Sequence, residues 1–227
     1  MPQIIITKDN SPTLFSEQFN AHYHSLFGAV KESQYVFVEN GLKFFNQQHS
    51  KNAIKIIKIL EIGWGTGLNC FLTFLEHQSN FIHQHIEYIS IEKYPLENGI
   101  ISQLSECYPF QQNKKLFLTL HSRELRIQLH QNFILQKIIL DINDALHQIK
   151  ENSIDIIYYD AFAPSSQPEM WNYSIFEKLY LLMNTNAVLV TFCAKGEFKR
   201  MLKKIGFIVE NPPGAAGKRE MTRAIKK

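Results

Sequence analysis

The sequence predicts an α/β fold, in which a mostly parallel sheet carries helices on both faces, with an antiparallel C-terminal strand and an N-terminal extension. Two observations favour this fold. Short apolar runs rich in Ile, Val and Tyr alternate with helix-like segments, a pattern typical of parallel strands buried on both faces. With 227 residues, 45% of them hydrophobic, the chain is also long enough to bury a substantial core as one domain.

The elements follow one another in a regular order. The apolar runs expected to form strands are 55–63, 86–92, 132–142, 153–160 and 187–192. The helices expected between them are 67–78, 95–106, 168–183 and 195–205. We also expect residues 125–130 to pair with the run 132–142 as a hairpin, and residues 207–225 to form a strand, a loop and a second strand.

Residues 1–50 have a different character. They are rich in aromatic residues and mix helical with strand spacing. We expect them to form an N-terminal extension or lid over the mouth of the sheet, with residues 51–227 as the main domain. A separate domain is not expected at this length.

Composition excludes several classes of protein. No apolar run approaches the ~20 residues needed to cross a bilayer, and the N-terminus lacks the pattern of a signal peptide, so we expect a cytoplasmic protein without membrane contact. Cys70, Cys107 and Cys193 are far apart, and neither they nor the nine histidines have metal-ligand spacing. No metal site is expected.

Positive charge is concentrated near the C-terminus. From Lys195 onward, ten Lys and Arg residues face three acids, a net charge of +7, while the rest of the chain carries −4. Such a basic region on a weakly acidic body is consistent with binding to a polyanion. The alternative is that "KGEFKRMLKK" is the solvated face of an ordinary helix.

A glycine-rich turn follows the first central strand. In "LEIGWGTGLNCFL", Gly63, Gly65 and Gly67 alternate before a helix-like segment. Glycines at the end of a strand permit a tight turn and the close approach of a ligand. The turn is neither GxGxxG nor a phosphate-binding P-loop, so it indicates a nucleoside ligand that needs no pyrophosphate cradle.

Four acids are expected at the carboxyl ends of strands: Glu61, Glu92, Asp141 and Asp160. Ligands of open α/β sheets bind at this edge. Glu92 could accept hydrogen bonds from both hydroxyls of a ribose, and Asp141 could accept one from the exocyclic amine of adenine. Alternatively, Asp141 and Asp144 could cap the next helix.

The order of these motifs resembles that of class I methyltransferases that use S-adenosylmethionine, which have a Rossmann-like fold. Within them, the MnmC methyltransferase-domain and MnmD family is the most similar; its members place the last methyl on 5-methylaminomethyl-2-thiouridine at the tRNA wobble position. The resemblance rests on "EIGWGTGLN", "ISIEKYPL", "DINDAL", "YYDAFAPSSQPEMW", "VTFCAKGEFKRMLKKIGF" and "GKREMTRA", and extends to "SEQFNAHYHSLFGAVKESQYVF". The combination of DxFAP, PxMW and KREM is far more specific than the glycine turn.

The resemblance implies S-adenosylmethionine as cofactor, with Glu61 and the glycines at its methionine end, Glu92 at the ribose and Asp141 at the adenine. The candidate cofactor-binding residues are Glu61, Gly63, Gly65, Gly67, Asn69, Glu92, Lys93, Asp141, Ile142 and, in the lid, Tyr35. Three positions depart from the family pattern: Trp64 replaces a common Phe, Ala161 a common Gly, and Leu140 a Gly that bears on the adenine assignment. The flavin-dependent oxidase half of bifunctional relatives is not expected, because no second glycine-rich nucleotide signature is present.

Asp160 is the expected catalytic residue. An amine attacks a methyl group only through its free lone pair, so an aminomethyl substrate must first lose a proton. A carboxylate within ~2.6–3.2 Å of the nitrogen could orient the amine and receive that proton. Most of its effect would come from placement of the reacting atoms.

The candidate substrate-binding residues are Phe162, Pro164, Met170, Trp171, Lys218 and Arg219. Phe162 and Trp171 offer flat faces for a wobble base flipped from the anticodon loop. Alternatively, Trp171 and Met170 anchor the following helix in the core. Lys218 and Arg219 could contact phosphates.

The expected function is therefore tRNA wobble-uridine N-methylation, with the tRNA anticodon loop as partner. One alternative is an amine N-methyltransferase that acts on a small molecule or a protein, which would also use Asp160 but not the basic C-terminal region. Another is a non-catalytic protein that binds S-adenosylmethionine or tRNA, which would leave the combination of Asp160 and the glycine turn unexplained.

Overall fold

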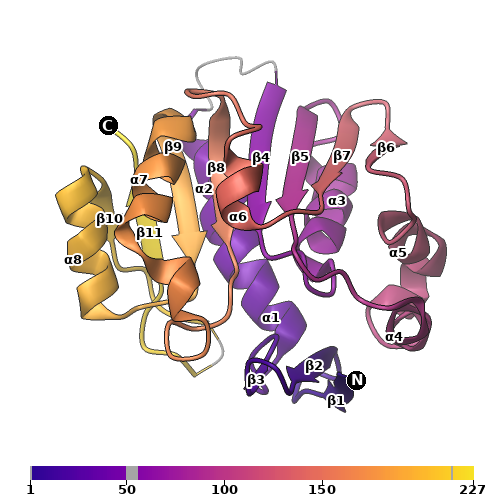
Figure 1. Cartoon of the computed structure of the whole chain (residues 1–227). Helices are drawn as coiled ribbons and strands as arrows, with labels where there is room; N and C mark the ends of the chain where they lie inside the picture. The colour runs from indigo at the N-terminus through magenta and orange to yellow at the C-terminus, as the bar shows by residue number, and fades with distance from the viewer. Residues whose placement is uncertain (1, 50–55, 216) are drawn as a thin grey trace.

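A computed structural model describes residues 2–49, 56–215 and 217–227 of the chain. Its centre is an eight-stranded sheet with the order β10-β11-β9-β8-β4-β5-β7-β6 (Figure 1). The strands of the parallel part are β4 (Ile56–Ile62), β5 (His85–Ile91), β7 (Phe133–Ile138), β8 (Ile154–Tyr159) and β9 (Met183–Thr191). This part confirms the predicted fold class.

Both edges of the sheet are antiparallel. At one edge β6 (Arg126–His130) pairs with β7, as the expected hairpin. At the other, β11 (Thr222–Ile225) pairs with β9, and β10 (Ile208–Glu210) pairs with β11. The predicted antiparallel C-terminal strand is therefore confirmed.

The middle of the sheet is buried on both faces, as β8 shows. All six residues of β8 are buried, and alternate side chains point to opposite faces, so Tyr158 belongs to one core and Tyr159 to the other. Fully burying a large apolar side chain stabilises the fold by about 1.5–3 kcal/mol. Because neither face of β8 meets water, both the strand and the residue that follows it, Asp160, are firmly placed.

Each face of the sheet has its own helices. The core on the Tyr158 face includes residues of α3 (Leu68–Asn80), α4 (Asn98–Leu104) and α5 (Lys114–Leu120). The core on the Tyr159 face includes residues of α6 (Ile142–Leu146), α7 (Tyr173–Leu182) and α8 (Gly196–Ile205). None of the helices among the described residues is long and apolar enough to cross a membrane.

The N-terminal region has two parts. Strands β1 (Gln3–Ile6), β2 (Pro12–Ser16) and β3 (Ala21–His22) form a small antiparallel sheet at one end of the molecule (Figure 1). Then α1 (Ala29–Ser33), the π-helical segment η1 (Gln34–Lys43) and α2 (Phe44–Gln48) follow without a break and contribute to the core on the Tyr158 face. The proposed boundary between residues 50 and 51 lies outside the described residues.

Four elements differ from the sequence prediction. Strand β9 begins at Met183 rather than at residue 187. Strand β7 ends at Ile138 rather than 142, because Asp141 has already turned to cap α6. The helix expected over 168–183 is divided into the short 3-10 helix η3 (Pro168–Trp171) and α7, since the Asn172 side chain accepts a 3.0 Å hydrogen bond from Ile175 N and starts a new helix. Helix α5, with the preceding 3-10 turn η2 (Phe110–Asn113), was not predicted.

Candidate active site

A cavity of about 330 Å³ lies at the carboxyl ends of β4, β5 and β8. Eleven of the candidate site residues line it: Gly63, Gly65, Asn69, Glu92, Lys93, Asp141, Ile142, Asp160, Phe162, Met170 and Lys218. The six candidates that do not line it are Tyr35, Glu61, Gly67, Pro164, Trp171 and Arg219. The sheet edge identified from the sequence is therefore the place where most of the candidates meet.

The glycine turn brings backbone, rather than side chains, to the floor of the cavity. Gly63 has φ +90°, and a Cβ at this position would lie 2.7 Å from the backbone oxygen of Asp160. At Gly65 (φ +50°), a Cβ would lie 3.0 Å from the ring of Tyr23. Larger residues would thus collide with the walls of the cavity. Gly67 has another place, since it precedes α3 as the N-terminal cap.

The first turn of α3 connects two acids. Asn69 Nδ2 donates hydrogen bonds to Glu61 Oε1 (3.0 Å) and to Asp160 Oδ2 (2.8 Å). Glu61 is completely buried beneath the cavity. Burial raises the pKa of Glu61 to about 8, which the hydrogen bond from Asn69 opposes and the negative charge of Asp160 reinforces. Glu61 is therefore largely neutral at pH 7.

Asp160 is a carboxyl group with a proton affinity suited to acid-base chemistry. Burial raises its pKa to about 7, against the hydrogen bond from Asn69, which favours the charged form. Two other charged groups also affect this pKa: Glu32 raises it and Lys218 lowers it. At neutral pH Asp160 can therefore both accept and release a proton.

Glu92 and Asp141 are held by backbone amides. Glu92 accepts hydrogen bonds from Gly65 N (3.1 Å) and from Tyr94 N (2.7 Å). Asp141 caps α6 by accepting from Asn143 N (3.0 Å), and Lys93 Nζ lies 3.0 Å from its other oxygen. The hydrogen bond from Asn143 is the main reason why the pKa of Asp141 is lowered. Asp141 thus serves as a helix cap, one of the two alternatives, while it also lines the cavity.

Aromatic residues of the N-terminal region cover one side of the cavity. The ring of Phe162 stacks on Phe19, with 4.7 Å between ring centroids, and meets the edge of Tyr23 at 5.0 Å. Residues 18, 19 and 21–25 and Glu32 all line the cavity. The sequence reasoning missed Phe19, Tyr23, His24 and Glu32. Their signal was the aromatic and histidine content of "SEQFNAHYHSLF", but no spacing distinguished the individual residues.

Trp171 occupies a different place from Phe162. It is 9% exposed, packs edge-on against Tyr159 and Phe198, and donates a 2.7 Å hydrogen bond from Nε1 to the carbonyl of Phe162. It therefore anchors the loop in the core and is not placed to contact a ligand in the cavity. Of the two alternatives for Trp171, these contacts favour the core anchor, while Met170, next to it, does line the cavity.

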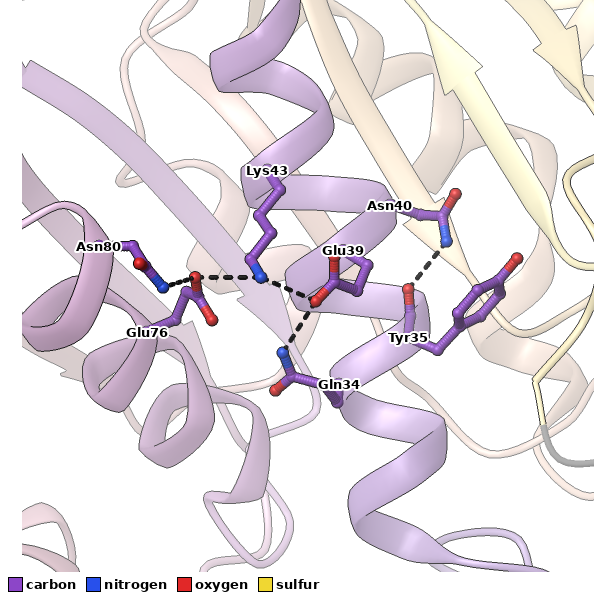
Figure 2. A network of polar contacts seen from close by, with 7 residues as sticks. All are labelled: Gln34, Tyr35, Glu39, Asn40, Lys43, Glu76 and Asn80. Atoms are coloured by element: carbon purple, nitrogen blue, oxygen red, sulfur yellow. Dashed lines mark hydrogen bonds and ion pairs between the residues drawn. The ribbon is translucent and has the colours of Figure 1, made fainter.

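Tyr35 lies on η1, away from the cavity. Its carbonyl accepts a 2.9 Å hydrogen bond from Asn40 Nδ2, in a group of polar contacts that also contains the Glu39–Lys43 pair (Figure 2). Tyr35 does not line the cavity, so its expected place beside the cofactor stays a prediction. The residues of the N-terminal region that lie nearest the glycine turn are those around Tyr23.

The two basic candidates near the C-terminus, Lys218 and Arg219, have different surroundings. Lys218, whose side chain is 38% exposed, lines the cavity and forms an ion pair with Glu32, whereas Arg219 is exposed and outside the cavity. Among the described residues, no group of three or more His, Cys, Asp or Glu side chains is placed to hold a metal ion.

Comparison with known proteins gives a consistent result. A family model described as S-adenosyl-L-methionine-dependent methyltransferase matches residues 105–227. The tRNA 5-methylaminomethyl-2-thiouridine biosynthesis bifunctional protein MnmC of Leptospira interrogans is 34% identical over 96% of the chain, and that of Pseudoalteromonas atlantica is 32% identical over 94%. The chain spans only about a third of the length of these relatives, 34% and 32% respectively.

Solved structures resemble the fold. MnmC2 from Aquifex aeolicus superposes with a TM-score of 0.83 at 23% identity, covering 100% of this chain and 70% of that one. A probable spermidine synthase from Corynebacterium glutamicum has a TM-score of 0.53 at 12% identity, covering 99% of this chain and 75% of the other. At these identities the likeness concerns the fold alone.

Proposed function

Because the chain belongs to the family of S-adenosyl-L-methionine-dependent methyltransferases, we propose that it methylates the amine of 5-aminomethyl-2-thiouridine at the wobble position of tRNA. The observation that carries the proposal is the position of Asp160. This carboxyl group shares one cavity with the glycine turn and with the Phe162 ring. With tRNA as the substrate, the partner is the anticodon loop and the reaction takes place in the cytoplasm.

The cavity has features that fit S-adenosylmethionine. The glycine turn presents bare backbone to the cavity, since a Cβ at Gly63 or Gly65 would lie only 2.7 Å from the Asp160 backbone oxygen or 3.0 Å from the Tyr23 ring. Asn69 Oδ1 is buried without a hydrogen-bond partner among the described residues, so it is available to an ammonium group such as that of a methionine end. Glu92 and Asp141, along the same wall, would hold the ribose and the adenine.

In the proposed reaction Asp160 orients the substrate amine and receives its proton. When bound, S-adenosylmethionine supplies an electrophilic methyl group. With a pKa of about 7, Asp160 is ionised in a large fraction of molecules at neutral pH and can accept a proton from an ammonium group. Asn69 fixes the carboxylate by its 2.8 Å hydrogen bond, so the nitrogen is presented with its lone pair free.

The aromatic wall serves the base. Phe162, which stacks on Phe19 and meets the edge of Tyr23, forms with them an aromatic wall on which a flipped uridine can stack. Residues 18–25 act as part of the lid over the bound nucleoside. The exposed basic residues of α8 and its start, Lys195, Arg200, Lys203 and Lys204, add positive charge that suits an RNA backbone.

Methyl transfer to defined RNAs tests the proposal. Purified protein, labelled S-adenosylmethionine and tRNA bearing 5-aminomethyl-2-thiouridine should give label at the wobble nucleoside. The same tRNA without the aminomethyl group is the control and should remain unlabelled. Label found only on free amines or on protein, with none on the modified tRNA, would contradict the proposal.

A further inference from the structure

The cavity contains an ammonium group of the protein itself. Lys218 Nζ lies 2.5 Å from Glu32 Oε1 and 4.3 Å from the centroid of the Phe192 ring. Lys218, Glu32 and Phe192 all line the same cavity as Asp160. A carboxylate combined with an aromatic face is a common way for proteins to bind an ammonium group.

This pair differs from an ordinary surface ion pair. The Glu32 side chain is only 7% exposed, and its second oxygen is fixed by a 2.8 Å hydrogen bond from Ser25 N. A buried carboxylate without a cationic partner is strongly unfavourable. A cation bound next to Glu32 therefore stabilises this part of the cavity wall.

The pair is also close to Asp160. The charges of Glu32 and Lys218 both act on the pKa of Asp160, in opposite directions. His24 lines the cavity as well, but burial lowers its pKa to about 4, so it is neutral at pH 7. Two carboxylates and one ammonium then face this part of the cavity, and a second cation is attracted to it.

We propose that Glu32 and the Phe192 ring form an ammonium-binding subsite beside Asp160, which Lys218 fills in the free protein and the aminomethyl group of the substrate fills on entry. The ligand is a primary alkylammonium. In the substrate complex, Glu32 binds the protonated amine, and Asp160 then takes one proton from it, leaving a neutral amine and a neutral carboxylic acid. The identity of the substrate rests on the proposed function, whereas the existence of an ammonium-binding subsite does not depend on it.

A binding experiment tests the subsite without tRNA. In Lys218→Met the internal cation is removed, so methylammonium chloride should raise the midpoint of thermal unfolding by about 3–6 °C at ten times its Kd, relative to sodium chloride. The double variant Glu32→Gln/Lys218→Met should show no such difference. Equal responses of the two variants would overturn the proposal.

Steady-state kinetics with the modified tRNA test whether the subsite binds the substrate amine. Glu32→Gln should raise KM by roughly tenfold or more at pH 7 while changing kcat much less, because a charge-assisted hydrogen bond to the substrate is lost. The increase should shrink at pH values at which the substrate amine is neutral. An increase that is the same at every pH, or none, would overturn the assignment of Glu32.

Two controls separate direct contact from indirect effects. Glu39→Gln removes a carboxylate that pairs with Lys43 at 2.9 Å (Figure 2). Glu39 does not line the cavity, so KM should be unchanged. Glu32→Gln/Lys218→Met should keep the raised KM. Recovery of the wild-type KM in the double variant would show that Glu32 only neutralises Lys218 and would overturn the proposal. If the wild type does not methylate the tRNA at all, the proposed function fails, while the methylammonium experiment still decides the subsite.

Discussion

Asn69 donates a 2.8 Å hydrogen bond to Asp160, a residue 91 positions further along the chain. Its amide also binds Glu61, so one side chain of α3 links a buried acid of β4 to the acid that follows β8. Because the hydrogen bond favours the charged form of Asp160, it opposes the effect of burial on the pKa. The position and the proton affinity of the proposed catalytic group thus depend on the same contact.

Asp160→Asn should abolish most of the turnover without loss of cofactor binding. The amide keeps the size of the side chain but cannot accept a proton from the substrate ammonium, so kcat should fall by about 10²–10⁴-fold. Single-turnover methylation and calorimetric titration with S-adenosylmethionine measure the two effects. Unchanged turnover would remove Asp160 from its proposed role.

Asn69→Leu should move the acid limb of the pH profile. Since the ionised form of Asp160 is the active one, kcat/KM of the wild type should rise with pH through about 7. Loss of the hydrogen bond from Asn69 raises the pKa of Asp160. The rise of kcat/KM should therefore occur at a pH about one unit higher. Asn80→Leu, on the same helix but bonded to Glu76 (Figure 2), is the matched control and should leave the limb in place.

Glu61→Gln should change how stability depends on pH. The folded pKa of Glu61, about 8, is above the ordinary value of 4.5, so the folded state holds the proton more strongly. Its contribution to stability is therefore fully present below about pH 4.5 and is lost as pH rises through about 8. Unfolding midpoints between pH 5 and 8.5 should fall more steeply for the wild type than for Glu61→Gln; parallel curves would show that Glu61 does not titrate in this range.

Trp171 and Phe162 should respond differently to truncation. Trp171→Ala removes a buried ring and should lower the free energy of unfolding by about 3–5 kcal/mol, whereas Trp171→Phe should lower it less. Phe162→Ala should mainly raise KM for tRNA, by an amount equivalent to about 1–3 kcal/mol of base stacking. Denaturant unfolding and steady-state kinetics on both variants check this contrast. A Trp171→Ala variant that keeps its stability but has a raised KM for tRNA would contradict it.

The parallel sheet and the edge that carries the site were predictable, since β4, β5, β8 and β9 are short apolar runs whose pattern is local. The acids at their ends follow from that pattern too. Asp160 and Glu92 occupy the expected places in the cavity because a residue that follows a buried parallel strand can lie only at its carboxyl edge.

Contacts between distant segments could not be predicted. Nothing in the sequence near Glu32 indicates that it faces the cavity, because its burial depends on how α1 meets a loop 186 residues later. The role of Trp171 was undecided for the same reason: a tryptophan after a strand can face a ligand or the core, and only the positions of Tyr159 and Phe198 decide it. Helix α5 was missed although an asparagine, Asn113, occupies its N-cap position, and the Asn113 side chain makes no capping hydrogen bond in the structure.

The separation between Glu32 and Lys218 also has a consequence for biosynthesis. A contact between segments so far apart in the sequence is non-local, and we expect it to form late in folding. We therefore expect the wall of the cavity to stay incomplete during translation until residue 218 has left the ribosome, when much of the sheet can already be in place.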